Sequence, residues 1–408
     1  MKHLRILVVS SKYPPEYSGS GERAHRTYQR LRSKYDVSFD VLCSSVTENT
    51  NASYIYENVQ IERIASKWIP QESRQQGESR SLLNKVALRV NYASEIVPVF
   101  NFLSKRHYFY DLVHVFGNAA VTSAAITFCN RLKKPLLVEV TYDAKPQPYK
   151  PFFMKFFDRE RSGFHPQAQF VCISKRLEKL CRESGIEQKI WTRPNPIDTA
   201  LFCVDRKGKL EYRSQHCRFG VKDIVLVNVA KFMPLKNQIF LVDVLRHLPE
   251  KYKLVLAGPL VKDGPNVERD HIFLRAIKEK IAGYQLPERV QIVEGFISSV
   301  EEYMKMADVY LFPSKMEGLG TPMIESLCCG VPVVANHIAG VTDEWIEEGK
   351  NGYTSSLDPQ AFAQKVEMAV KLTEPVLTQK AKELQSIADI NAIDETYLRI
   401  FHAMTHSN

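Results

Sequence analysis

Several protein classes are excluded by what the chain lacks. None of its 408 residues lies in an uninterrupted apolar run of the ~18 residues that a membrane-spanning helix needs. The first apolar run, Leu4–Ser10, lacks a small-x-small cleavage pattern and runs into Lys12, Pro14 and Pro15. We therefore expect a buried first strand there rather than a signal peptide.

Signals for disulfide and metal chemistry are also missing. The eight cysteines form no CxxC pair, and most lie within apolar runs. This pattern is typical of free thiols in a reducing compartment, and no clustered ligands indicate a zinc site. No Asp-x-Asp follows a predicted strand, so nothing indicates a diphosphate held by a metal ion. We predict free cysteines and no bound metal.

What the chain does contain is an alternation of short apolar runs and amphipathic segments. Strands that are apolar throughout, separated by helices, predict parallel sheets covered on both faces. The pattern occurs twice, which predicts an α/β fold of two doubly wound, Rossmann-like domains facing a central cleft. The predicted strands are Leu4–Ser10, Ser38–Cys43, Val59–Ile64, Leu112–Phe116, Leu136–Val140, Gln169–Ile173, Ile224–Ala230, Lys253–Ala257, Val290–Glu294, Val309–Pro313 and Val331–Ala335.

The join between the domains is expected near Arg193–Asp198, because Pro194 and Pro196 interrupt both helix and strand. We predict an acceptor-side domain over 1–196 plus 388–408 and a nucleotide-sugar-binding domain over 197–387. The last segment, Ile393–Ala403, has an apolar stripe that predicts a terminal helix returning to the first domain. The polar stretch Ser66–Ser81 is expected to be a surface loop.

The segment Glu317–Glu325 carries the strongest chemical signal. Its two glycines allow close backbone approach to a ligand, and Pro322 suits a first helical turn. The backbone N–H groups of Leu319, Gly320 and Thr321 would then point from a helix N-terminus, where a diphosphate can bind. Glu317 and Glu325 are acceptor-only groups that suit sugar and ribose hydroxyls. The alternative is an ordinary helix start with an acidic residue near its dipole.

Two other loops follow predicted strands. Lys231 and Lys236 can converge on a diphosphate and neutralise a leaving group, or they can be solvated surface lysines. Gly19 and Gly21 belong to a G-x-G-x-x-A string, but it starts about eight residues after the strand, too late for a dinucleotide fingerprint. We expect a loop that reaches towards a phosphate and an acceptor.

Polar residues in the first half are candidates for acceptor contacts. His114 lies among alternating apolar residues near a strand end, and the alternative, a satisfied core histidine, is the better explanation of that pattern. Asn118 follows it, and Tyr142 and Asp143 follow the strand Leu136–Val140, with ordinary surface roles as the alternative.

With these motifs, the chain resembles the family 4 glycosyltransferases, which are retaining enzymes of the GT-B fold. The similar residues include the E-x7-E pair Glu317 and Glu325, the Cys-Gly-Val-Pro-Val-Val run ending at Val334, and Pro-Asn-Pro-Ile-Asp ending at Asp198. The resemblance implies a fold of two Rossmann-like domains. It also implies transfer of a hexose-type sugar from a UDP- or GDP-linked donor, without metal or other cofactor. It also implies that the leaving phosphate serves as the base.

The resemblance also implies roles for individual residues. Glu325 would bind the ribose, Glu317 the sugar ring, and the lysines the diphosphate. The remaining implied donor contacts are the backbone of Gly21 and the stretch bordering the base, which comprises Glu294, Gly295 and Phe296.

Two positions depart from the family pattern. Lys231 stands where arginine is usual, so a point charge replaces a bidentate fork. Phe116 stands where many relatives have a catalytic histidine, and His114 does not inherit that role. Two alternatives therefore stay open: a nucleotide-sugar epimerase of the same fold, and a non-catalytic partner subunit of another transferase.

Charge is distributed unevenly along the chain. Residues 1–196 hold 30 Lys and Arg against 18 Asp and Glu, whereas the rest is slightly acidic. The segment Leu82–Tyr110 combines basic and aromatic residues in the way of interfacial helices. We expect a cytoplasmic protein that contacts an anionic inner membrane face and uses a glycan or lipid-linked acceptor, as in polysaccharide biosynthesis, with no nucleic acid partner. The alternatives are a merely solvated basic surface and a soluble acceptor.

Overall fold

The computed structural model describes residues 3–16, 18–45, 50–65, 82–141, 164–260 and 267–405, with the backbone alone for 82–93. The chain forms two compact units. The first unit comprises residues 1–173, 177–193 and 394–408, and the second comprises 174–176 and 194–393.

The first unit contains an eight-stranded sheet in the order β3-β4-β2-β1-β5-β6-β7-β8. All neighbouring strands are parallel except β3 and β4, which are antiparallel. The interior strands are apolar because helices cover both faces of the sheet. The strands are β1 (Leu4–Ser10), β2 (Val37–Ser45), β3 (Ala52–Tyr56), β4 (Val59–Ala65), β5 (Leu112–Phe116), β6 (Leu136–Val140), β7 (Gln169–Cys172) and β8 (Lys189–Thr192).

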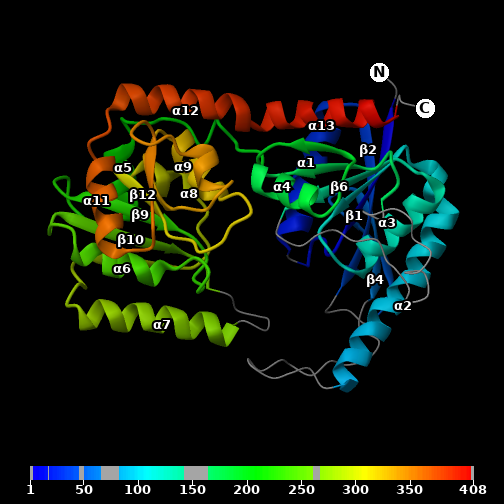
Figure 1. Cartoon of the computed structure of the whole chain (residues 1–408), viewed down its shortest axis with the longest axis horizontal. Coiled ribbons are helices and arrows are strands. Elements are labelled where there is room, and N and C mark those ends of the chain that lie inside the picture. Colours follow the sequence, from blue (N-terminus) through cyan, green and yellow to red (C-terminus); the bar gives the residue numbers. More distant parts are fainter. Residues whose placement is uncertain are drawn as a thin grey trace. The chain divides into compact units, whose positions relative to one another are not determined.

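Helices of the first unit pack on this sheet through aromatic and aliphatic side chains. Tyr28 of α1 stacks on Phe401 of α13. The end of the chain therefore belongs to this unit, as predicted, and Figure 1 shows α13 next to α1. The helices are α1 (Gly19–Lys34), α2 (Leu82–Arg106), η1 (His107–Phe109, a 3-10 turn), α3 (Ala120–Leu132), α4 (Lys175–Glu183) and α13 (Ile390–Thr405), with the first residues of α4 and α13 counted in the second unit.

The second unit contains a six-stranded sheet in the order β11-β10-β9-β12-β13-β14, in which every pair is parallel. Its core joins strand residues such as Leu226 and Leu254 to helix residues such as Phe240 and Phe362. The strands are β9 (Ile224–Val229), β10 (Tyr252–Gly258), β11 (Val290–Glu294), β12 (Val309–Phe312), β13 (Val333–Asn336) and β14 (Gly352–Ser355).

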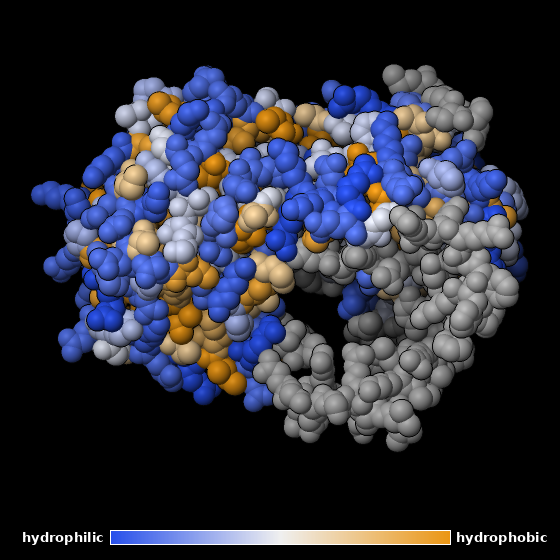
Figure 2. All heavy atoms as spheres, in the orientation of Figure 1, coloured by the Kyte–Doolittle hydropathy of each residue, from blue (hydrophilic) through white to orange (hydrophobic). Residues whose placement is uncertain are grey.

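Eight helices of the second unit fall within the described residues. Figure 1 shows α7 lying outside α6, and Lys280 of α7 pairs with Asp243 of α6 at 2.5 Å. The visible face of this unit is largely hydrophilic, with scattered apolar residues, as is usual for a protein surface (Figure 2). The helices are α5 (Lys209–His216), α6 (Gln238–Arg246), α7 (Val267–Gly283), α8 (Val300–Lys305), α9 (Thr321–Cys328), α10 (Thr342–Trp345), α11 (Pro359–Ala369) and α12 (Glu374–Ala388).

Strand order fixes where each sheet can hold a ligand. In the second unit, β9 lies between β10 and β12. The chain adds β10 and β11 on one side of β9 and then crosses to add β12 on the other side. In the first unit, β1 lies in the same way between β2 and β5. Open α/β sheets bind ligands beyond the carboxyl ends of the strands at such a switch point. The loops after β9 and β12, and those after β1 and β5, are therefore the places to examine.

The predicted fold class is confirmed: each unit is a sheet of mainly parallel strands, with β3 as the antiparallel exception, and helices connect most of the strands. All eight cysteines are free, as predicted, and the sulfurs of Cys172 and Cys181 lie 3.8 Å apart. The predicted surface loop Ser66–Ser81 lies outside the described residues. The assignment of an acceptor side and a donor side, and the predicted cleft, stay predictions.

Candidate functional site

In the second unit, the loops after β9 and β12 are joined to each other by hydrogen bonds at the switch point. The backbone N–H of Lys315 donates to the carbonyl of Leu235 at 3.0 Å, and Asn237 Nδ2 donates to the carbonyl of Pro313 at 3.3 Å. These bonds bring together the predicted residues Lys236 and Glu317.

Helix α9 begins in this surface as the sequence predicts. Gly320 caps it with φ +79°, and a Cβ there would lie 3.0 Å from the Phe312 ring, so the position favours glycine. Pro322 occupies the first turn. Within the described residues, the N–H groups of Leu319, Gly320 and Thr321 donate to no acceptor. The helix start therefore has donors available for an anion.

Lys236 and Glu317 form an ion pair across the two loops, with Nζ 2.5 Å from Oε1. Both side chains are mostly buried, so solvent screens the pair less than a surface pair. Ser174 Oγ donates to the carbonyl of Gly318 at 2.6 Å and holds the loop beside Glu317. The predicted cation and carboxylate thus neutralise each other in this structure.

Glu325 lies one turn inside α9 and is half-buried. Burial, with a smaller contribution from Glu301, raises the pKa of Glu325 to about 7. Its carboxyl group has no hydrogen bond or ion pair among the described residues. A half-buried carboxyl group with a shifted pKa and spare acceptor capacity is a typical feature of a binding site.

Lys231 does not stand free at the end of β9. Its Nζ lies 3.1 Å from Oδ2 of Asp270, a buried residue in the first turn of α7, and Arg269 binds the same carboxylate. The sequence prediction missed Arg269 and Asp270. They lie on a helix far along the chain from Lys231, and no spacing rule connects them.

The stretch after β11 lies on the β10 side of the same edge. Glu294 pairs with Lys278 at 2.5 Å, and the N–H of Gly295 donates to the carbonyl of Gly258 at 3.1 Å. The Phe296 side chain is 86% exposed. An exposed ring beside a strand end offers a stacking surface for a planar ligand.

In the first unit, only the second of the two predicted glycines after β1 is required by local packing. Gly19 and Gly21 open α1, and the N–H of Gly21 donates to Ser18 Oγ at 3.0 Å. A Cβ on Gly21 would lie 2.3 Å from the carbonyl oxygen of Lys12, whereas one on Gly19 would meet nothing within 4 Å. The predicted donor contact of Gly21 stays a prediction, and its N–H is already occupied by the cap.

His114 is fully buried in the first unit. Nδ1 shares a hydrogen bond of 2.8 Å with the Tyr28 hydroxyl, and Nε2 lies 3.4 Å from Oε2 of Glu139. Burial lowers the pKa of His114 despite the nearby carboxylate. This placement matches the alternative of a core histidine and does not support the acceptor contact predicted for it.

The other acceptor-side candidates are placed differently. Asn118 is exposed just after β5, at the carboxyl edge of the first unit's sheet. Phe116 is buried within the same strand. Tyr142 and Asp143 lie outside the described residues. Only Asn118 is therefore both described and open to solvent.

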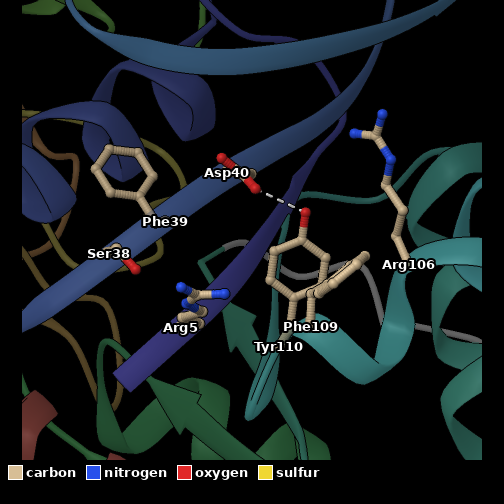
Figure 3. A pocket seen from close by; sticks show the side chains of 7 residues that line it. All are labelled: Arg5, Ser38, Phe39, Asp40, Arg106, Phe109 and Tyr110. Atoms are coloured by element: carbon tan, nitrogen blue, oxygen red, sulfur yellow. Dashed lines mark hydrogen bonds between the residues drawn. The ribbon is translucent and has the colours of Figure 1, made fainter. Parts of the chain in front are cut away.

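A pocket of about 470 Å³ lies at the opposite, amino end of the first unit's sheet (Figure 3). Arg5, Asp40 and Arg106 are among its lining residues, and the Tyr110 hydroxyl donates to Asp40 at 2.8 Å. The pocket does not include any predicted site residue. In the part of the chain that the structure describes, no group of three or more His, Cys, Asp or Glu could hold a metal ion.

Comparison with known proteins gives a consistent result. Residues 213–385 match the family model described as "Glycosyl transferases group 1". The chain is 27% identical over 248 residues to an alpha-monoglucosyldiacylglycerol synthase from Streptococcus pneumoniae, covering 57% of this chain and 53% of that protein. It is 29% identical over 170 residues to a GDP-mannose-dependent alpha-(1-6)-phosphatidylinositol monomannoside mannosyltransferase from Mycolicibacterium smegmatis, covering 39% and 41%. These matches thus span about half of the relatives' length or less.

Solved structures match over almost the whole chain. Anabaena Alr3699/HepE in complex with UDP and glucose aligns with a TM-score of 0.70 at 16% identity, covering 98% of this chain and 100% of that one. Sucrose-phosphate synthase from Thermosynechococcus elongatus aligns with a TM-score of 0.71 at 17% identity, covering 99% and 100%. At such low identity these matches establish the shared fold.

Proposed function

We propose that this chain, which belongs to the group 1 glycosyl transferases and has the GT-B fold, moves a hexose-type sugar from a nucleoside-diphosphate sugar to a hydroxyl acceptor with retention of configuration. One observation carries the proposal. The Lys236–Glu317 pair, the free N–H groups at the start of α9 and the unpartnered Glu325 all gather at the switch point of one sheet.

The diphosphate is the first ligand group that this arrangement suits. Lys231, Lys236 and the N-terminus of α9 supply positive charge and N–H donors at one edge. An incoming diphosphate competes with Glu317 for Lys236, because both are anions within reach of the same ammonium group. Once Lys236 binds the phosphate, Glu317 is free to accept hydrogen bonds from hydroxyl groups of the donor sugar.

The nucleoside is placed by the neighbouring residues. The carboxylate of Glu325, one helical turn inside α9, accepts hydrogen bonds from the ribose hydroxyls. The exposed ring of Phe296 borders the base, and stacking on an aromatic ring tolerates either uracil or guanine.

The chemical step needs no nucleophile from the protein. The acceptor hydroxyl attacks the anomeric carbon on the face from which the diphosphate departs, and the bond from that carbon to the phosphate oxygen breaks. The hydroxyl proton passes to the leaving phosphate, so a nucleoside diphosphate and a glycoside are the products. Lys236 and the α9 N-terminus stabilise the negative charge that develops on the leaving group.

We further propose a glycan or lipid-linked acceptor that is reached at an anionic membrane face. Lys105 and Arg106 end α2, and Tyr108 and Phe109 in the following 3-10 turn have exposed rings. Cationic and aromatic residues together favour a membrane interface. Two relatives are named for a diacylglycerol glycolipid and a phosphatidylinositol mannoside. No helix in the described parts of the chain is long and apolar enough to cross a bilayer.

A nucleotide-binding and turnover assay tests the function. We expect UDP or GDP to raise the melting temperature, since a ligand at 100 times its Kd stabilises by about 2.7 kcal/mol. Lys236→Ala should lower kcat by about 10²–10³-fold, because it removes charge stabilisation from the leaving group. Lys222→Ala, which removes an exposed lysine at the other end of β9, is the matched control.

Other outcomes would assign the chain differently. Full turnover in both Lys236→Ala and Glu325→Ala would contradict the site. Appearance of an epimer from a nucleotide sugar without acceptor, followed by NMR, would indicate an epimerase. Absence of any nucleotide binding by calorimetry would indicate a non-catalytic partner subunit.

A further inference from the structure

Helix α7 brings a second basic side chain to the end of β9. Asp270, in its first turn, has a fully buried side chain. Its Oδ2 lies 3.1 Å from Nζ of Lys231, and its Oδ1 accepts from Nε and Nη2 of Arg269 at 3.0 and 2.8 Å. One buried carboxylate thus holds two cations, one from the loop after β9 and one from α7.

The balance of charge in this triad has a physical consequence. A buried carboxylate is costly unless it is paired, so Asp270 fixes the positions of both cations. Asp270 carries one negative charge and its partners carry two positive charges, which leaves one positive charge uncompensated within the triad. Lys231 and Arg269 each keep 33% of their side-chain surface exposed, so this charge is accessible to solvent.

The donors left over are suited to phosphate. Asp270 takes Nε and Nη2 of Arg269, so the Nη1 group takes no part in the pair. A guanidinium presents its N–H donors as a rigid fork that matches phosphate oxygens, whereas the ammonium of Lys231 acts as a point charge. Because Arg269 is anchored in advance, it loses less conformational freedom when it binds.

We propose that Arg269 is a further residue that binds the donor diphosphate, and that Asp270 is the positioning residue that sets Arg269 and Lys231 for it. This inference rests on the proposed function, because it adds a contact to the same donor. It assigns the phosphate charge to three side chains, with Arg269 and Lys231 at the β9–α7 side of the edge and Lys236 at the β12 side.

The first test compares Arg269→Gln with Arg275→Gln, which removes the same charge from an exposed position of the same helix. Calorimetry with UDP, UMP, GDP and GMP measures the affinity. We expect Arg269→Gln to weaken diphosphate binding about tenfold and monophosphate binding much less, and to reduce the salt dependence of binding. Arg275→Gln should bind like the unaltered chain. Equal diphosphate affinity in the two variants would overturn the proposal.

The second test concerns Asp270 as a positioning residue. Asp270→Asn should raise the KM for the donor several-fold with a smaller change in kcat, and combining it with Arg269→Gln should add little further loss. A purely structural role would instead lower the melting temperature and leave the double variant additive. If Asp270→Asn does not fold, the Arg269→Gln comparison still decides, because Arg269 is partly exposed.

Inorganic pyrophosphate separates failure of this inference from failure of the proposed function. If pyrophosphate raises the melting temperature in a way that depends on Arg269, and no nucleotide binds, the anion subsite is supported and the donor assignment is contradicted. Nucleotide binding that is indifferent to Arg269 would contradict the subsite and leave the proposed function standing.

Discussion

One charged cluster in the first unit and one in the second are placed in opposite ways. In the first unit, His114, Glu139 and Arg193 meet in the core, and the Tyr397 hydroxyl lies 3.2 Å from the same Glu139 oxygen that Arg193 binds. In the second unit, Lys231, Lys236, Glu317 and Glu325 stand partly exposed at the carboxyl edge. A closed cluster stabilises the fold, whereas an open one keeps capacity for a ligand. Exposure, rather than the presence of charge, separates the two roles.

The largest expected effect, on the free energy of unfolding, comes from removing the carboxylate of Glu139 from the buried cluster of the first unit. Burial alone would raise the pKa of Glu139, but Arg193, His114 and Arg23 lower it to about 2, so the residue is ionised at neutral pH. Glu139→Ala would leave Arg193 buried without its counter-charge, and we expect a loss of about 3–5 kcal/mol in the free energy of unfolding. Urea unfolding measures the loss, and hydrogen exchange should assign it to the first unit.

Glu294→Ala provides the matched control for that variant. It removes a carboxylate from an exposed pair with Lys278, and such pairs contribute about 0–1 kcal/mol. Equal destabilisation by the two variants would contradict the division into closed and open charge. Loss of nucleotide binding in a folded Glu139→Ala protein would show that the closed cluster also serves the ligand.

Much of the fold was predictable because buried parallel strands are apolar throughout. The predicted bounds of Leu4–Ser10 and Val290–Glu294 match the structure. The strands β3, β8 and β14 were missed. None of the three carries an apolar run, because β3 and β8 have no buried residue and β14, although largely buried, is the short polar stretch Gly352–Ser355. Lys189–Thr192, for example, has no buried residue.

The candidate site was only partly predictable, for a related reason. Glu317 and Glu325 lie on one loop and the helix that follows it, so their spacing carries a signal. Asp270 meets Lys231 only because β10 and α7 fold beside β9, and nothing local marks that contact. His114 was ambiguous because its partners Tyr28 and Glu139 come from other elements.

A smaller effect is expected at the glycines of the first unit. Gly21→Ala would place a Cβ 2.3 Å from the Lys12 carbonyl oxygen, and relieving that contact should cost about 1–3 kcal/mol of stability. Gly19→Ala meets nothing within 4 Å and should change stability by about 0.5 kcal/mol or less. Thermal unfolding compares the two variants. If the Gly21→Ala protein has normal stability but binds nucleotide more weakly, the result would support the donor contact predicted for Gly21.

The smallest expected effect is the pH dependence of binding at Glu325. Burial raises its pKa to about 7, so the group is increasingly protonated below pH 7 and a carboxylate acceptor is lost. If the carboxylate binds the ribose, nucleoside diphosphate affinity at pH 6 should be about tenfold lower than at pH 8. The terminal phosphate of the ligand also titrates near pH 6. The deciding quantity is therefore the affinity ratio between the unaltered chain and Glu325→Gln, measured by calorimetry across this range. Glu325→Gln cannot titrate, so the ratio should fall towards low pH. A constant ratio would mean that ionisation of Glu325, the open carboxyl group of the second unit, does not contribute to nucleotide binding.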